Sequence, residues 1–210
     1  MNFLVINGSP KGEYSITLQT VRYWEALHPE HNFQVLHVGQ RIKALEKDFS
    51  PAMEALNAAD ALIFSYPVYT FIAPCQLHRF IELMKEHQAP VQGKYATQLT
   101  TSKHFYDVTA HRYIQDNCGD LGLKYIRGLS ADMDDLLKEK GQKEAEAFFE
   151  YVLWSMENDS FEGISAISTT PKHCPVTVPA SEGEKQGDVV IVSDCEADNH
   201  HLQSMIDRFR

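Results

Sequence analysis

The amino-acid sequence predicts an α/β domain built on a doubly wound parallel sheet, with a short extension after it. Apolar runs suited to buried strands alternate with amphipathic helical segments along residues 1–162, and parallel strands need crossover connections of this kind. A chain of 210 residues can bury one core well but is short for two complete domains. We therefore expect one domain over 1–162, an irregular linker or loop rich in proline and glycine over 163–187, and a strand with a helix over 188–210. This last segment either extends the sheet or begins a second, similar unit.

The alternation begins with FLVIN at residues 3–7, a continuous apolar run before Gly8 that indicates a strand buried on both faces. Residues 16–27 then carry apolar side chains at helical spacing. The remaining elements are predicted in order as a strand at 33–38, a short helix at 51–59, a strand at 61–67, a helix after Pro74, a strand at 94–101, a helix at 108–117, a strand at 123–129 and a long helix around 145–156. Crossovers between such parallel strands are right-handed.

Composition excludes several classes of function. Hydrophobic residues make up 43% and charged residues 23% of the chain, as in ordinary folded proteins. The 19 Lys and Arg against 29 Asp and Glu give a net charge of −10, which argues against nucleic-acid or membrane partners. No stretch approaches the roughly 20 apolar residues of a membrane helix, and residues 1–8 lack the features of a signal peptide. We expect a cytoplasmic protein.

No metal site is predicted. The four cysteines are widely separated and form no C-x-x-C pair, so neither a zinc site nor a disulfide framework is indicated. His200 and His201 are adjacent and cannot share one helix face as an i, i+4 pair of ligands would.

The first predicted loop, GSPKGEYSIT at residues 8–17, is rich in glycine and hydroxyl groups. In open α/β sheets ligands lie beyond the carboxyl ends of the strands, where a helix start offers free amides. The nucleoside-triphosphate motif G-x-x-x-x-G-K-[ST] and the dinucleotide motif G-x-G-x-x-G are both absent. The hydroxyls of Ser9, Ser15 and Thr17 therefore indicate a site for a monophosphate. The alternative is a plain turn in which Ser15 caps the helix.

Two further loops end at the same edge of the predicted sheet. YPVYTFIAP at 66–74 is expected to carry Tyr66, Tyr69 and Phe71 past the strand, where a planar ring would cover them. The alternative is a loop packed on its own protein or at a dimer interface. TTSKHFYD at 100–107 supplies hydrogen-bond donors, or else its Thr and Ser cap a helix.

With these three segments the sequence resembles the flavodoxin-like NAD(P)H-dependent FMN reductase and quinone reductase superfamily over roughly residues 1–157. The resemblance implies a five-stranded parallel sheet of order 2-1-3-4-5 with a C-terminal β-α extension, and an FMN-binding domain over 1–162. It also implies FMN contacts from three groups of residues. The first loop would contribute Ser9, Pro10, Lys11, Ser15, Ile16 and Thr17, the second Pro67, Val68, Tyr69, Thr70 and Phe71, and the third Thr101, Ser102, His104 and Tyr106.

The resemblance has departures. Ile16 stands where the family usually has Asn, and HRFIEL at 78–83 replaces a more usual Lys-x-Phe-x-Asp. Residues 39–60 contain no cysteine, so we predict no iron-sulfur cluster.

The function implied is transfer of hydride from NADPH or NADH to FMN and of electrons onward to a quinone, flavin or similar small-molecule acceptor, with no obligate catalytic acid or base. A homodimer is expected, because it would cover Tyr69 and Phe71. The alternatives are a flavodoxin-type electron carrier that does not oxidise NAD(P)H itself, and a cofactor-free interaction domain.

Overall fold

The computed structural model describes residues 1–102, 107–163, 191, 193 and 199–209. The chain divides into two compact units, Met1–Ala166 and Ile167–Arg210. In the second unit, helix α7 spans His200–Phe209, where a C-terminal helix is predicted. Most of the strand predicted to precede it lies outside the described residues. Among the described residues, no helix is both long enough and apolar enough to cross a bilayer.

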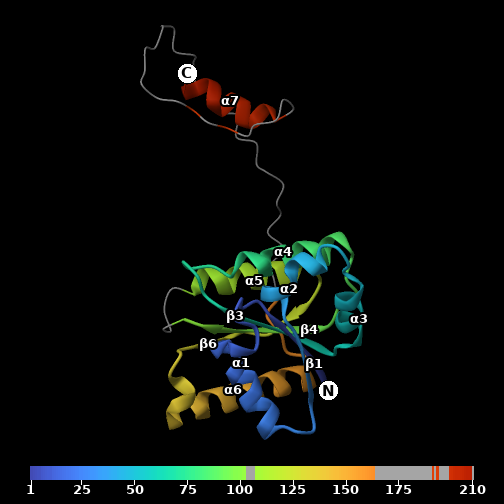
Figure 1. Cartoon of the computed structure of the whole chain (residues 1–210), viewed down its shortest axis with the longest axis vertical. Coiled ribbons are helices and arrows are strands. Elements are labelled where there is room, and N and C mark those ends of the chain that lie inside the picture. Colours follow the sequence, from blue (N-terminus) through green and yellow to red (C-terminus); the bar gives the residue numbers. More distant parts are fainter. Residues whose placement is uncertain (103–106, 164–190, 192, 194–198, 210) are drawn as a thin grey trace. The chain divides into compact units, whose positions relative to one another are not determined.

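The first unit is organised around a parallel sheet of order β2-β1-β3-β4-β5, as the resemblance implies, with β6 also pairing with β4 (Figure 1). Each pair runs parallel, with Phe3 opposite Ala61 and Ala61 opposite Tyr95 across the three central strands. The strands are β1 Asn2–Asn7, β2 Asn32–Leu36, β3 Ala61–Pro67, β4 Tyr95–Thr101, β5 Lys124–Tyr125 and β6 Leu129–Ala131.

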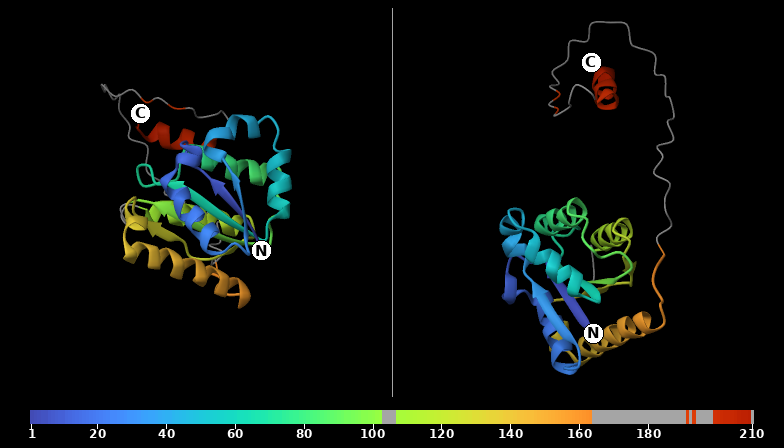
Figure 2. Two further views of the ribbon diagram at one scale, coloured as in Figure 1. Left: turned by 60° about the horizontal axis from the view of Figure 1, so that its bottom comes forward. Right: turned by 90° about the vertical axis from the view of Figure 1, so that its right-hand side faces the viewer.

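Helices cover both faces of this sheet. In Figures 1 and 2, α2, α4 and α5 lie on one face, and α1 and α6 lie on the other. The helices of the first unit are α1 Ile16–Leu27, α2 Val38–Leu45, α3 Ser50–Ala58, α4 Cys75–Glu86, α5 Val108–Asp120 and α6 Glu139–Glu157, with short 3₁₀ helices at Gly12–Tyr14 and Asp135–Leu137.

The alternation of side chains along the strands divides the core into two layers. Leu4 and Ile6 of β1 belong to the cluster under α2, α3, α4 and α5. Phe3 and Val5 belong to the opposite cluster, which contains Trp24 of α1 and side chains of α6. Both layers are apolar, so each central strand is buried on its two faces, and this is why the strands read as continuous apolar runs.

The structure corrects two features of the predicted fold. The fifth strand is not continuous over 123–129 but splits into β5 and β6. Gly128 lies in the break, where a Cβ would stand 2.6 Å from the Gln98 carbonyl oxygen of β4, a distance that only glycine permits. In addition, α2 was not predicted.

Candidate functional site

Three loops meet in one pocket at the carboxyl edge of the sheet. They follow β1, β3 and β4, and the pocket has a volume of about 210 Å³. A fourth segment, which follows β6, also reaches it. The lining residues are Ser9, Lys11, Ser15, Ile16, Thr17, Pro67, Val68, Tyr69, Thr101, Ser102, Asp132 and Met133.

Asn7, the last residue of β1, holds the first loop in place through two hydrogen bonds. Its buried side chain accepts a hydrogen bond from the Ser9 amide at 3.0 Å and donates one to the Gly12 carbonyl at 3.0 Å. Gly12 has φ +56°, a conformation that glycine adopts without steric cost. Helix α2 packs closely against this loop, because a Cβ on Gly39 would lie only 2.3 Å from the Ser9 carbonyl oxygen. The loop shape is therefore fixed before any ligand binds.

The start of α1 is left open toward this pocket. Ser15 occupies the N-cap position, yet its hydroxyl makes no capping hydrogen bond to the helix, contrary to the plain-turn alternative. The side chain is buried and lines the pocket. The first amides of an α-helix have no partner within the helix, and the positive end of the dipole lies there. Hydroxyl and amides are thus both available to an anion.

A direct contact joins the first loop to the third. The hydroxyl oxygens of Thr17 in α1 and Thr101 at the end of β4 lie 2.7 Å apart, and either one can donate. Both side chains line the pocket. The contact fixes the distance between the start of α1 and the end of β4, which are far apart in the sequence.

The second loop contains a strained turn. The amides and carbonyls of Tyr69 and Ile72 exchange two hydrogen bonds, of 2.9 and 3.2 Å, around Thr70 at φ 49° and Phe71 at φ 72°. Turns with positive φ at both central residues favour Gly and Asn, and a β-branched residue there is costly. Such strain concentrates at functional sites. Tyr69 and Phe71 are about half exposed.

The third loop is anchored by Asp107, the residue before α5. Its buried carboxylate accepts a hydrogen bond of 3.0 Å from Ser102 and one from Ser130 of β6. Burial raises the pKa of Asp107. The hydrogen bonds from these hydroxyls and the adjacent His111 together lower it by more than burial raises it, so the pKa lies below its ordinary value. Asp107 therefore remains ionised and holds Ser102 at the pocket.

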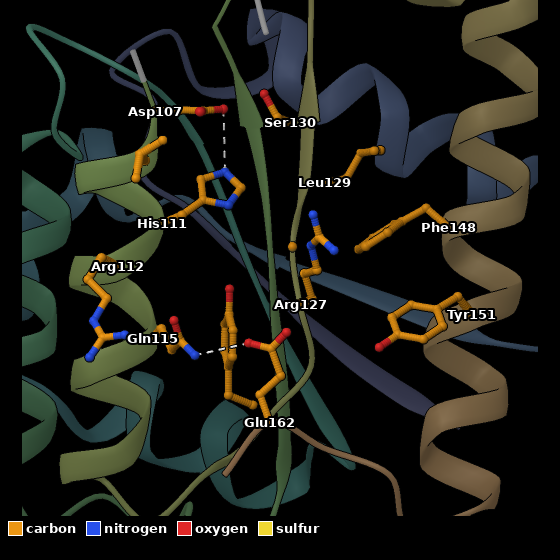
Figure 3. A pocket seen from close by; sticks show the side chains of 13 residues that line it. Asp107, His111, Arg112, Gln115, Arg127, Leu129, Ser130, Phe148, Tyr151 and Glu162 are labelled. Atoms are coloured by element: carbon orange, nitrogen blue, oxygen red, sulfur yellow. Dashed lines mark hydrogen bonds and ion pairs between the residues drawn. The ribbon is translucent and has the colours of Figure 1, made fainter. Parts of the chain in front are cut away.

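A larger cavity, of about 840 Å³, lies beside β5 and β6 between α5 and α6 (Figure 3). Asp107 and His111 approach to 3.6 Å on its wall, and Gln115 donates a 2.9 Å hydrogen bond to Glu162. Burial lowers the pKa of His111, while Asp107 partly opposes this shift. None of the hydroxyl-bearing residues of the first loop line this cavity. Asp107 lines this cavity and accepts the hydrogen bond from Ser102, which lines the three-loop pocket.

Most predicted site residues come together in the three-loop pocket. Pro10, Thr70 and Phe71 are not among its lining residues, and His104 and Tyr106 lie outside the described residues. The prediction for Tyr66 is wrong: it is not past the sheet edge but inside β3, fully buried, with its hydroxyl donating to Gln98 at 2.5 Å.

Sequence reasoning missed Asp132 and Met133, which follow β6 and line the pocket. The sequence LSADMDD at 129–135 held a usable signal, because an apolar segment is followed there by a polar cluster at the same carboxyl edge. The fifth strand was predicted to end at 129, so the residues after 131 were not recognised as following a strand end. Asn7 was also missed, because a polar residue at the end of a buried strand was counted only as part of the strand.

The donor set suits FMN. Hydroxyls, free helix amides and Lys11 match a phosphate monoester, which can be bound at a helix start without a metal. Pro67, Val68 and Tyr69 offer an apolar edge to a flat ring. The pocket that the described residues enclose, of about 210 Å³, is smaller than the roughly 300 Å³ at which small-molecule sites begin. Residues 103–106, which follow Ser102, are not among the described residues.

Comparison with known proteins agrees with this architecture. Residues 1–151 match a family, Flavodoxin_2, described as having a flavodoxin-like fold. No curated protein sequence matched the chain.

Among solved structures, an NADPH-quinone reductase from P. pentosaceus is 16% identical with TM-score 0.55, and the match covers 72% of this chain and 97% of that protein. An NADH:FMN oxidoreductase, EMOB, is 18% identical with TM-score 0.60, covering 78% and 91%. An FMN-dependent NADH-azoreductase from Bacillus anthracis is 14% identical with TM-score 0.52, covering 72% and 98%. At these identities the likeness concerns the fold. With a family match over 151 of its residues, the chain is a member of the flavodoxin-like Flavodoxin_2 family.

Proposed function

We propose that this protein is an FMN-dependent NAD(P)H oxidoreductase that passes electrons to a quinone, a flavin or a similar small molecule. The observation that carries the proposal is the convergence of three loops, from β1, β3 and β4, on one pocket with an uncapped helix start. Membership of the Flavodoxin_2 family supports it, as does the likeness of the fold to an NADPH-quinone reductase and an FMN-dependent NADH-azoreductase.

In this proposal the first loop holds the phosphate of FMN. Ser15 and Thr17 are buried hydroxyl donors at the start of α1, and Lys11 adds an exposed positive charge. Ile16 lacks the side-chain donor of the usual family residue, but its backbone amide is one of the free amides of the helix start. Phosphate binding here relies on hydroxyls and the helix dipole more than on side-chain charge.

The other two loops would hold the flavin ring. Pro67 and Val68 present apolar surface, and Thr101 and Ser102 present hydroxyls at the end of the neighbouring strand. When bound, FMN would accept hydride from a nicotinamide and deliver electrons to the acceptor. The residues of this chain orient the cofactor and exclude water from it, and we assign none of them as a catalytic acid or base.

The rim of the pocket carries exposed apolar side chains. Tyr69 and Met133 line the pocket and are 45% and 55% exposed, and Phe71, two residues after Tyr69, is 48% exposed. Exposed apolar groups gathered around a polar site mark an interaction surface. We propose that a second copy of the chain covers this rim in a homodimer.

The test is anaerobic reduction of the FMN-loaded full chain by NADPH or NADH, followed by visible absorption. Loss of the oxidised flavin band on mixing, and its return when a quinone is added, supports the proposal. Bound FMN that accepts electrons from dithionite but not from either nicotinamide would indicate an electron carrier. A chain that binds no FMN would indicate an interaction domain.

A further inference from the structure

A cluster of two histidines and a glutamate lies at the other end of α1 from the FMN pocket. His28, Glu30 and His31 each offer one ligand atom, and these atoms lie within 4.8 Å of one another. His28 is 12 residues beyond Ile16, the first residue of α1, which corresponds to roughly 18 Å along the helix. The cluster is therefore separate from the proposed FMN site.

The local sequence HPEH explains why the two imidazoles lie on the same side. A residue before proline avoids the α conformation, so α1 ends at Leu27 and His28 takes φ −124° and ψ 65°. The His31 amide then donates to the His28 carbonyl at 3.1 Å. Pro29 suits the second position of such a turn, and the turn leaves the two rings nearly parallel with centroids 6.1 Å apart.

Aromatic packing holds both rings. The His28 ring lies 4.8 Å from that of Phe149, and the His31 ring lies 5.7 Å from that of Phe3. The two histidine side chains are only 15% and 14% exposed. The orientation of the ring nitrogens is therefore set by the fold and needs little ordering when an ion binds.

One carboxylate oxygen of Glu30 faces both histidines. It lies 3.2 Å from Nδ1 of His28 and 3.7 Å from Nε2 of His31. A tetrahedral ion with bonds of ~2.1 Å separates its ligand atoms by ~3.4 Å, so little movement is needed to coordinate one. Nδ1 of His31 is buried without a hydrogen-bond partner in the described part of the chain, which leaves Nε2 as the nitrogen directed at the cluster.

A second carboxylate lies near the other ring nitrogen of His28. Glu150 of α6 lies 3.9 Å from Nε2 of His28, the nitrogen that does not face Glu30. In the structure Nδ1 of His28 lies within hydrogen-bond distance of Glu30, at 3.2 Å. When an ion takes Nδ1, the ring proton is carried on Nε2, where the Glu150 carboxylate stabilises it, as in carboxylate-histidine-metal arrangements.

We propose that His28, Glu30 and His31 bind one divalent transition-metal ion of the Zn²⁺ class, with solvent completing its coordination. Two imidazoles and one carboxylate suit Zn²⁺, Co²⁺ or Ni²⁺ better than Mg²⁺ or Ca²⁺, which prefer oxygen ligands. Because the ligands span the connection between α1 and β2, and Glu150 adds α6, the ion stabilises this end of the domain.

Equilibrium dialysis of the metal-stripped full chain against ZnCl₂, with elemental analysis of the retained zinc, tests this. We expect one tightly held equivalent in the wild type, at least tenfold weaker binding in Glu30→Gln, and loss of that equivalent in His28→Gln/His31→Gln. The matched control His200→Gln/His201→Gln, which alters the other close histidine pair, is expected to retain it. Equal binding by the wild type and the His28→Gln/His31→Gln variant, or no stoichiometric zinc in the wild type, would overturn the proposal.

A stability readout guards against misfolded variants. Zinc at about 100 times its dissociation constant is expected to raise the melting temperature of the wild type by about 5 °C. Glu30→Gln keeps the packed imidazoles and is expected to fold, so it should melt like the metal-free wild type and show little response to zinc. A full response to zinc in Glu30→Gln would count against the carboxylate as a ligand. Mg²⁺ at the same concentration is expected to have no effect.

Discussion

The hydroxyl oxygens of Thr17 and Thr101 lie 2.7 Å apart, although the two residues are separated by 84 positions in the chain. This hydrogen bond connects the start of α1 to the end of β4 across the proposed FMN site. The shape of the site therefore depends on a contact between two crossovers of the fold and not on one local motif.

Thr17→Val tests that contact. Valine keeps the shape of threonine but leaves the Thr101 hydroxyl without this partner, so we expect the free energy of unfolding to fall by about 1 kcal/mol and FMN to bind about tenfold more weakly. Urea unfolding and FMN titration measure the two effects. Thr17→Ser retains the hydroxyl and should remain close to the wild type. Unchanged FMN affinity in the valine variant would remove Thr17 from the site.

Ser15→Ala separates ligand binding from helix capping. Replacing a serine that caps a helix typically costs ~1 kcal/mol, but Ser15 makes no capping hydrogen bond. We expect the free energy of unfolding to change by less than about 0.5 kcal/mol, while FMN affinity falls about tenfold because a hydroxyl donor to a charged phosphate is lost. The opposite pattern, a less stable protein with normal FMN affinity, would identify Ser15 as a cap.

His111 is expected to make stability depend on pH. Its folded pKa is lowered, chiefly by burial, so the unfolded chain binds a proton more readily as the pH falls below about 6.5. Stability from this group is complete above that value and declines toward the lower folded pKa. His31 and His78 shift in the same direction, so His111→Gln should reduce the slope between pH 7 and 5 without abolishing it. Urea unfolding at a series of pH values measures the slope, and an identical slope in the variant would contradict this assignment.

Replacing Thr70 in its turn is expected to raise the stability of the protein. Asparagine tolerates the left-handed conformation that Thr70 adopts at φ 49°, so Thr70→Asn should raise the free energy of unfolding by about 1 kcal/mol. Thermal unfolding compares it with Thr109→Asn, a control at an exposed position within α5 where no gain is expected. A Thr70→Asn variant no more stable than the wild type would show that the turn stores no such strain.

Leu137→Asp tests the proposed homodimer. Leu137 is 82% exposed and lies four residues after Met133, which lines the pocket, and a charge there would disfavour an apolar contact between two copies. Sedimentation analysis should give a dimer for the wild type and a monomer for the variant, with the circular dichroism spectrum unchanged. A wild-type monomer would refute the dimer but not FMN binding.

The sequence was sufficient to predict a doubly wound parallel sheet because its central strands are buried on both faces, and the strand order was predicted from the family resemblance. Their continuous apolar runs and the amphipathic segments between them leave few other arrangements. It failed at α2, where VGQRIKAL is short, largely polar and contains Gly39. That glycine is explained only by its approach to the Ser9 carbonyl, a contact invisible in the chain order.

The candidate site was predictable where a motif and a strand end coincide, as for Ser9, Ser15 and Thr17. It was not predictable where tertiary pairing decides. Asp132 reaches the pocket because β6 pairs with β4 after the chain breaks at Gly128, and Tyr66 is retained in the core by its hydrogen bond to Gln98. The proposed metal site at His28–His31 was likewise overlooked, because the placement of its rings depends on packing against Phe3 and Phe149.

The most direct test of the central claim is titration of the full chain with FMN, followed by flavin fluorescence and carried out in parallel on Ser15→Ala and Thr17→Val. The account predicts saturation at one FMN per chain in the wild type and about tenfold weaker binding in each variant. Absence of saturable binding in the wild type, or equal affinity in all three proteins, would contradict it.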